Sequence, residues 1–119
     1  MSNLSDPVAH IPPFNDMTVA KALDDVLGEV GRQDQLARSG KFGGTHVMPG
    51  GSDLERLAVL AEEFGELSIE VCKGIEKNRQ VRRPGLRDEA VQVAAVAVAW
   101  IAAIDEGRAV AGVEEGNNE

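Results

Sequence analysis

Side chains that end in carboxylate or carboxamide groups occur in two short stretches of the sequence, at positions 62–66 and 89–92. Within each stretch the groups lie three or four residues apart, which places them on one face of a helix. Two such faces on neighbouring helices would form an all-oxygen site for a hard divalent cation, the usual partner of nucleotide phosphates. The side chains that carry these groups are Glu62, Glu63, Glu66, Glu89 and Gln92.

Carboxylates gathered in a partly dry site are costly without a cation, because like charges repel and burial disfavours charge. Mg²⁺ or Mn²⁺ suits oxygen ligands, whereas zinc prefers His or Cys, and His10 and His46 lack metal-ligand spacing. A second interpretation is that Asp88 and Glu89 only favour a helix N-terminus and that the other glutamates face water. Spacing alone leaves both interpretations open.

Composition limits the class of protein. The chain has 119 residues, enough for one domain, and 12 Lys plus Arg against 20 Asp plus Glu give a net charge of −8. An acidic chain is a poor general nucleic-acid binder. The longest apolar run, from Val93 to Ile104, is shorter than the roughly 20 residues needed to cross a bilayer. We expect a soluble, cytoplasmic protein that binds neither nucleic acid nor membrane.

The elements that would position the acidic residues are helical. Three helical patterns occur without convincing strand alternation, which predicts an all-α fold. The first pattern runs over about residues 16–38, with Asp16 or Thr18 as N-cap, and the second opens with a capping box formed by Ser52 and Glu55. Flexible segments are expected at residues 1–15 and 107–119, on either side of a helical domain at 16–106.

The third pattern begins near Leu86 and is apolar on all sides from Val93 to Ile104. A helix of this kind is expected at the centre of a bundle or at an interface between subunits. Three helices cannot easily surround it, so we expect a homodimer or homotetramer. Cys72, within the second pattern, is expected to be a buried structural thiol. If the second and third helices are antiparallel, their acidic residues meet more easily if the second helix breaks near Gly74 or if the segment after it forms another short helix.

The spacing of these residues resembles a family signature. Glu62-Glu63-x-x-Glu66, followed by Glu89-x-x-Gln92, is similar to the EExxE…ExxD motif of MazG-like all-α nucleoside triphosphate pyrophosphohydrolases. The resemblance covers about residues 54–104, plus an Arg-Gln step that small phage-encoded relatives carry late in the first helix. Gln92 departs from the motif, since it stands where the family usually has Asp and brings no negative charge.

The resemblance implies an antiparallel helical bundle whose core is completed by oligomerisation, and cleavage of a nucleoside triphosphate into the monophosphate and pyrophosphate. It also implies Mg²⁺ or Mn²⁺ as cofactor, held by Glu63, Glu66, Glu89 and Gln92. Glu62 is expected as a further ligand, an orienting group or the catalytic base. One kind of small phage relative, MazZ, acts on dGTP and GTP, so a purine substrate and a host cytoplasm are expected.

Positive charges that could bind phosphates lie between the two acidic stretches. Lys73, Arg83 and Arg87 are the candidates from this cluster, and Arg32 and Gln33 from the first helix could contact a base. The cluster could instead be a solvated basic loop.

Two other classes of function remain open from the sequence. One is a non-catalytic helical oligomerisation module whose acidic stripe faces water. The other is a nucleotide-binding regulator that keeps the metal site without turnover. Trp100, inside the apolar run, is expected to pack in the core rather than to stack on a base.

Overall fold

The computed structural model describes three α-helices and, within the residues it describes, no strand. The helices are α1 (Asp16–Ser39), α2 (Asp53–Glu76) and α3 (Pro84–Asp105). This confirms the all-α fold class and the number of helices. The described residues are 10–40, 51–76 and 84–108, so the expectations for most of both chain ends and for Arg83 lie outside them.

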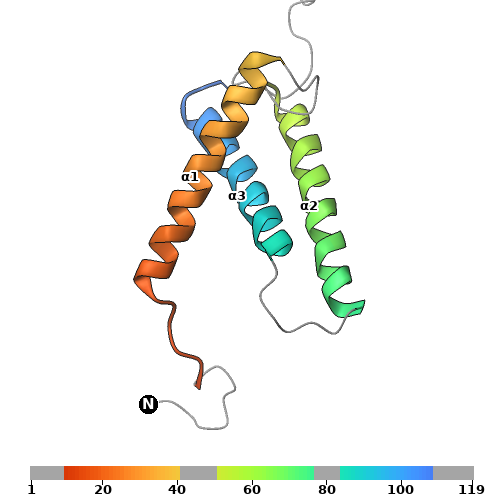
Figure 1. Cartoon of the computed structure of the whole chain (residues 1–119). Helices are drawn as coiled ribbons and strands as arrows, with labels where there is room; N and C mark the ends of the chain where they lie inside the picture. The colour runs from red at the N-terminus through yellow and green to blue at the C-terminus, as the bar shows by residue number, and fades with distance from the viewer. Residues whose placement is uncertain (1–9, 41–50, 77–83, 109–119) are drawn as a thin grey trace, which may run out of the picture.

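Helix α3 lies between the other two helices (Figure 1). It packs against α1 and against α2, and the described parts of α1 and α2 do not pack against each other. Along the chain α1 and α3 run in the same direction, and α2 runs opposite to both (Figure 1). The acidic stretches of α2 and α3 therefore lie on neighbouring antiparallel helices.

Helix α1 begins and ends with side chains and backbone that satisfy its terminal groups. Asn15 is its N-cap, and the Asn15 side-chain oxygen accepts hydrogen bonds from the backbone N–H of Met17 at 2.8 Å and of Thr18 at 3.2 Å. The expected cap, Asp16 or Thr18, is thus wrong by one to three residues, because Asn15 offers the same acceptor from the extended backbone that an N-cap needs. Gly40 follows the helix at φ 67°, in the left-handed region.

Helix α2 opens with the capping box that the sequence predicts. The Ser52 N–H donates to Glu55 Oε1 at 3.0 Å, and the Glu55 N–H donates to Ser52 Oγ at 3.1 Å. The bond from Ser52 is a main reason why the pKa of the Glu55 carboxyl is lowered.

Helix α3 starts at Pro84, two residues before the expected start at Leu86. Proline suits a first helical turn because the N–H it lacks would have no partner there. The helix ends in a Schellman motif, in which the Arg108 N–H donates to the Ala103 carbonyl and the Gly107 N–H to the Ile104 carbonyl. Gly107 adopts φ 71° at this turn.

Contacts at the two ends fix the pairing of α2 with α3. The Trp100 Nε1–H donates to Asp53 Oδ1 at 2.8 Å, so this part-buried indole joins the end of α3 to the start of α2. At the other end Gly85 faces Glu70, whose Oε1 would lie 2.6 Å from a Cβ at Gly85. Helix α3 thus begins opposite Glu70, short of the end of α2, and α2 continues through Gly74 without a break.

The core that the described residues form is small. No large side chain among the described residues is fully buried. The buried apolar residues have short or β-branched side chains: Ala37, Ala95, Val96 and Ala103. Val98, Ile101 and Ile104 of α3 are 42–57% exposed, so one chain does not enclose α3 on all sides. None of the described helices is long and apolar enough to cross a membrane.

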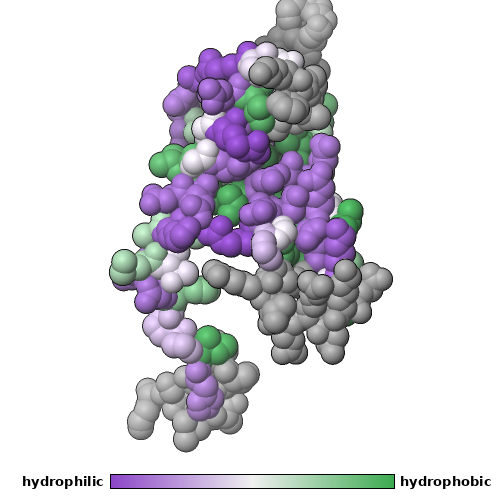
Figure 2. Space-filling model, viewed as in Figure 1, coloured by the Kyte–Doolittle hydropathy of each residue, from purple (hydrophilic) through white to green (hydrophobic). Residues whose placement is uncertain are grey.

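Helix α2 carries a continuous row of exposed apolar side chains, here named the outer apolar stripe. Its members are spaced three, four or seven residues apart and are 40–74% exposed: Leu54, Leu57, Phe64, Val71 and Ile75. Cys72 lies beside this row and is exposed, so the expectation of a buried thiol is wrong. The reason is that α2 has two apolar sectors, and Cys72 belongs to the one that faces away from α3. On the face shown in Figure 2, hydrophilic side chains cover much of α1 and α2, with apolar side chains visible between them.

Candidate metal centre

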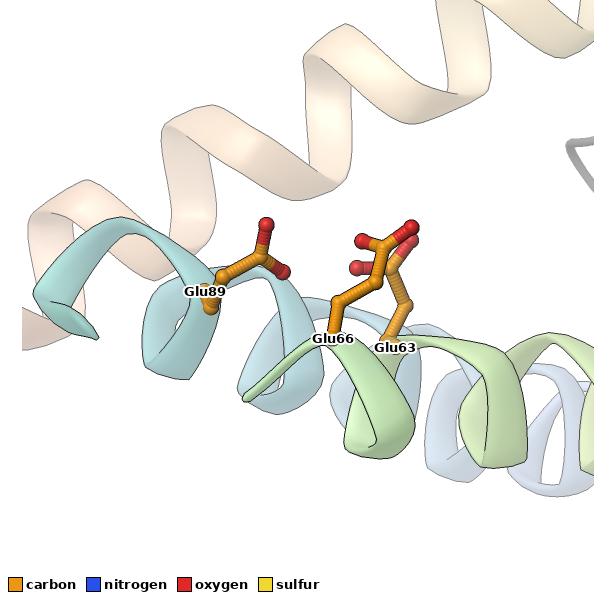
Figure 3. A group of neighbouring side chains, drawn as sticks. All are labelled: Glu63, Glu66 and Glu89. Carbon is orange, nitrogen blue, oxygen red and sulfur yellow. The ribbon is translucent and has the colours of Figure 1, made fainter. Parts of the chain in front are cut away.

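Three carboxylates from two helices meet at one point of the structure, and we name them the acidic cluster: Glu63, Glu66 and Glu89. One oxygen from each lies within 4.8 Å of the others. Glu63 and Glu66 extend from α2 and Glu89 from α3, and all three side chains point into the space on the side of these helices that faces α1 (Figure 3). The antiparallel pairing of α2 and α3 is what places residues 23 or more positions apart beside one another.

The acidic cluster is electrostatically strained without a cation. Burial raises the pKa of the Glu63 carboxyl to about 7, and the neighbouring charges of Glu66 and Glu89 add to the effect. Burial and the charge of Glu66 raise the pKa of Glu89 in the same way. Both directions are those expected for carboxylates that share a partly dry site with like charges.

Two oxygen atoms of the acidic cluster have unused acceptor capacity. Glu63 Oε2 and Glu89 Oε2 are buried, and neither has a hydrogen-bond partner among the residues that the structure describes. A buried carboxylate oxygen normally receives a hydrogen bond or binds a cation. The donor set consists of carboxylate oxygens, so the site fits Mg²⁺ or Mn²⁺ better than a metal that prefers nitrogen or sulfur.

The other two acidic-stretch residues lie near the acidic cluster but not within it. Gln92 follows Glu89 by three residues on α3 and is half-buried, so it is placed on the helix side that carries Glu89. Glu62 is exposed on α2 and is not among the carboxylates that converge. The structure therefore brings three of the four expected ligands, Glu63, Glu66 and Glu89, within 4.8 Å of one another. Gln92, the fourth, follows Glu89 on the same side of α3.

Arg32 and Gln33 are held by a residue that the sequence reasoning did not select. Glu29 accepts from Arg32 Nε at 2.8 Å and Arg32 Nη2 at 2.6 Å, and its Oε2 also accepts from Gln33 Nε2 at 3.0 Å. The charge of Glu63 contributes to raising the Arg32 pKa, so this guanidinium lies within electrostatic range of the acidic cluster. The spacing of Glu29 three and four residues before Arg32 and Gln33 could have indicated this contact.

Arg87 and Lys73, the other phosphate-binding candidates that the structure describes, form ion pairs at the surface. Arg87 Nη2 lies 2.8 Å from Asp25 Oδ2 and links α3 to α1, and Lys73 Nζ lies 3.0 Å from Glu70 Oε2. Hydrogen bonds from Arg87 and Lys21 lower the pKa of Asp25. Both cations are at least half exposed, so they can exchange these partners for an anionic ligand.

The arrangement combines three converging carboxylates with arginine and lysine side chains from the three helices. Such a combination can bind a divalent cation together with a phosphorylated ligand, since the cation and the arginines neutralise different phosphate oxygens. Comparison of the chain with protein-family models, curated proteins and solved structures found no match.

Proposed function

We propose that the protein is a metal-dependent nucleoside triphosphate pyrophosphohydrolase of the MazG-like all-α type. The observation that carries this proposal is the convergence of Glu63, Glu66 and Glu89 within 4.8 Å, from the two helices that bear the signature-like spacing. Glu63 Oε2 and Glu89 Oε2 are buried and have no hydrogen-bond partner among the described residues. A bound cation would satisfy both oxygens. A fully solvated helix face would not bury these two oxygens.

In this proposal the acidic cluster and Gln92 hold Mg²⁺ or Mn²⁺. The cation, when bound, offsets charge on the phosphate oxygens and makes a water molecule a better nucleophile. Water adds across the α–β phosphoanhydride, so that one phosphorus gains the water oxygen, the bridging bond breaks and pyrophosphate leaves. Glu62 or Glu63 accepts the proton that the water loses, a role suited to a carboxylate at the edge of a charged site.

Phosphate binding is assigned to the cations that surround the acidic cluster. Arg32 is the strongest candidate because its guanidinium is already oriented by the two hydrogen bonds that it donates to Glu29, and because the charge of Glu63 helps to raise its pKa. Arg87 and Lys73 would leave Asp25 and Glu70 to bind phosphate oxygens, and Arg83 is a further candidate from the sequence. The proposed substrate is a purine nucleoside triphosphate such as dGTP or GTP.

We also propose that the protein is a homodimer or homotetramer in which a second copy covers the outer apolar stripe. The stripe extends over about 30 Å of helix, at about 1.5 Å per residue. A row of this length with each side chain at least 40% exposed is unusual on a monomer. A second copy is the natural occupant, because identical helices present stripes of equal length and matching apolar character.

The function is tested by offering each nucleoside triphosphate with Mg²⁺ or Mn²⁺ and separating the products. Monophosphate plus pyrophosphate supports the proposal, whereas diphosphate plus phosphate, or no product, contradicts it. Glu63→Ala should lower turnover about 100-fold or more, since it removes a central oxygen ligand. Asp24→Ala is the matched control, because Asp24 is an exposed carboxylate of α1 outside the acidic cluster.

The same assay separates the alternatives. Tight, metal-dependent nucleotide binding without any product would identify a nucleotide-binding regulator. Neither binding nor product, together with a stable oligomer, would identify a structural oligomerisation module.

A further inference from the structure

A cavity of about 370 Å³ lies beside the acidic cluster, between all three helices. Its lining includes Val59, four residues before Glu63 on α2, and Val96, four residues after Gln92 on α3. Four residues span about one helical turn, or roughly 6 Å along the axis. The cavity and the acidic cluster are therefore neighbouring sites on the same pair of helices.

Small side chains create the space in this cavity. Gly31 of α1 and Ala99, Ala102 and Ala103 of α3 all line it, where larger residues would fill it. Valines on each of the three helices complete an apolar lining. A lining of this kind favours a flat ring that contacts it through van der Waals and hydrophobic interactions.

Polar groups lie at defined places in the same cavity. Arg56 lines it and is only 5% exposed, and Asp34 lines it while accepting a hydrogen bond from Arg38 Nε at 2.9 Å. Arg offers N–H donors and a planar surface for stacking, and Asp offers acceptor oxygens. An aliphatic ligand would have no use for these groups, and a free phosphate would have no use for the apolar lining.

Glu29 connects the cavity to the acidic cluster. Through one carboxylate it holds Gln33, which lines the cavity, and Arg32, whose pKa the charge of Glu63 helps to raise. A ligand that lay along this connection would place its anionic end near Arg32 and the acidic cluster. Its other end would enter the cavity past Gln33.

We propose that the cavity is the subsite for the base of the nucleotide. This inference rests on the proposed function, because it places the phosphates at the acidic cluster. A nucleobase combines the two properties that the lining requires: flat apolar faces, and an edge of hydrogen-bond donors and acceptors. Asp34 reads N–H groups on that edge, and Arg56 lies against the ring or donates to its oxygen or nitrogen atoms.

The test fills the cavity without touching the acidic cluster. Ala99→Leu adds bulk to the lining, and Val98→Leu is the matched control, because Val98 is 42% exposed on the same helix and is not among the lining residues. Ala99→Leu should raise the KM for nucleoside triphosphates about tenfold or more. The inhibition constant of inorganic tripolyphosphate, which has no base, should stay within about twofold.

A second variant covers the case in which Ala99→Leu does not fold. Asp34→Asn keeps the size of the side chain and its hydrogen bond to Arg38, but replaces one acceptor oxygen with a donor. It should change the ratio of kcat/KM between the preferred and the least preferred base about tenfold. An unchanged ratio would contradict the role of Asp34 in reading the base.

The outcomes separate the subsite from the proposed function. If the protein hydrolyses nucleotides, equal KM values for Ala99→Leu and Val98→Leu would overturn the cavity assignment. An equal loss of affinity for nucleotide and for tripolyphosphate in Ala99→Leu would overturn it as well. If the unaltered protein hydrolysed no nucleotide, the proposed function would fail. Calorimetric titration with deoxynucleosides would then decide on the cavity: binding that Ala99→Leu abolishes supports it, and no binding overturns it.

Discussion

At the scale of single residues, Glu63 shows most clearly how burial and like charges act on the acidic cluster. Its pKa of about 7 arises from burial and from the charges of Glu66 and Glu89, against an ordinary value of 4.5. Between these two pH values the folded, metal-free protein binds more protons than the unfolded chain. Its stability therefore falls as the pH rises through this window.

This effect predicts a pH dependence of the metal-free protein. With a chelator present, the free energy of unfolding measured in urea should decrease between pH 5 and pH 8 by an amount on the order of 2 kcal/mol, after allowance for solvent screening. Glu63→Gln should remove most of the decrease, because the amide does not titrate. A slope that is unchanged in Glu63→Gln would show that Glu63 is not strained.

Gln92 supports a second prediction at the residue scale. Gln92→Asp should raise the affinity for Mn²⁺ about tenfold, because a fourth carboxylate adds charge beside Glu89. It should also destabilise the protein in the presence of a chelator, since the added charge repels the acidic cluster. Gln35→Asp on the exposed side of α1 is the control for added charge alone. Calorimetric titration with Mn²⁺ measures the affinity, and equal values for both variants would place Gln92 outside the metal site.

At the scale of the helices, local signals in the sequence predicted most of what is observed. Apolar periodicity located all three helices, and the Ser52 and Glu55 pair marked the start of α2 to the residue. Asn15 was missed as a cap because Asn15, Asp16 and Thr18 could each serve, and only the backbone conformation selects one. Pro84 was left outside α3, although proline commonly occupies a first turn.

The packing of the helices could be predicted less well than their positions. The apolar residues of α2 form two sectors, and periodicity does not say which one faces α3. Cys72 and Phe64 therefore could not be assigned to the outer side in advance. The meeting of Glu66 with Glu89 depends on α3 beginning opposite Glu70, which follows from the contact at Gly85 rather than from helix lengths.

The capping box gives a prediction at this scale. Ser52→Ala should lower the free energy of unfolding by about 1 kcal/mol, because it removes the acceptor for the Glu55 N–H at the start of α2. Ser68→Ala is the control, since Ser68 lies within α2 and its hydroxyl bonds to the Phe64 carbonyl. That change should leave stability equal or slightly raised, because alanine favours a helix interior. Urea unfolding measures both, and a larger loss in Ser68→Ala would contradict this description of the helix start.

At the scale of the whole molecule, the described residues form a small core and leave the outer apolar stripe exposed, and our proposal is that a second copy covers this stripe. Phe64→Glu should shift the protein toward the monomer and lower its melting temperature, because it places a charge in the proposed contact between copies. Met17→Glu, on an 81% exposed residue of α1 outside the stripe, should leave the assembly unchanged. Light scattering after size-exclusion chromatography gives the mass. A monomeric unaltered protein, or an equal oligomer in Phe64→Glu, would contradict the proposed covering of the stripe.

The central claim is that the acidic cluster binds a divalent cation, and metal-dependent thermal stability tests it most directly. The melting temperature is measured with a chelator and with millimolar Mn²⁺ or Mg²⁺, with and without nucleotide, for the unaltered protein and for Glu89→Gln. The account predicts a rise of about 5 °C or more with Mn²⁺ in the unaltered protein, and a much smaller rise in Glu89→Gln. An unaltered protein whose melting temperature does not change with either metal, even with nucleotide present, would contradict the account.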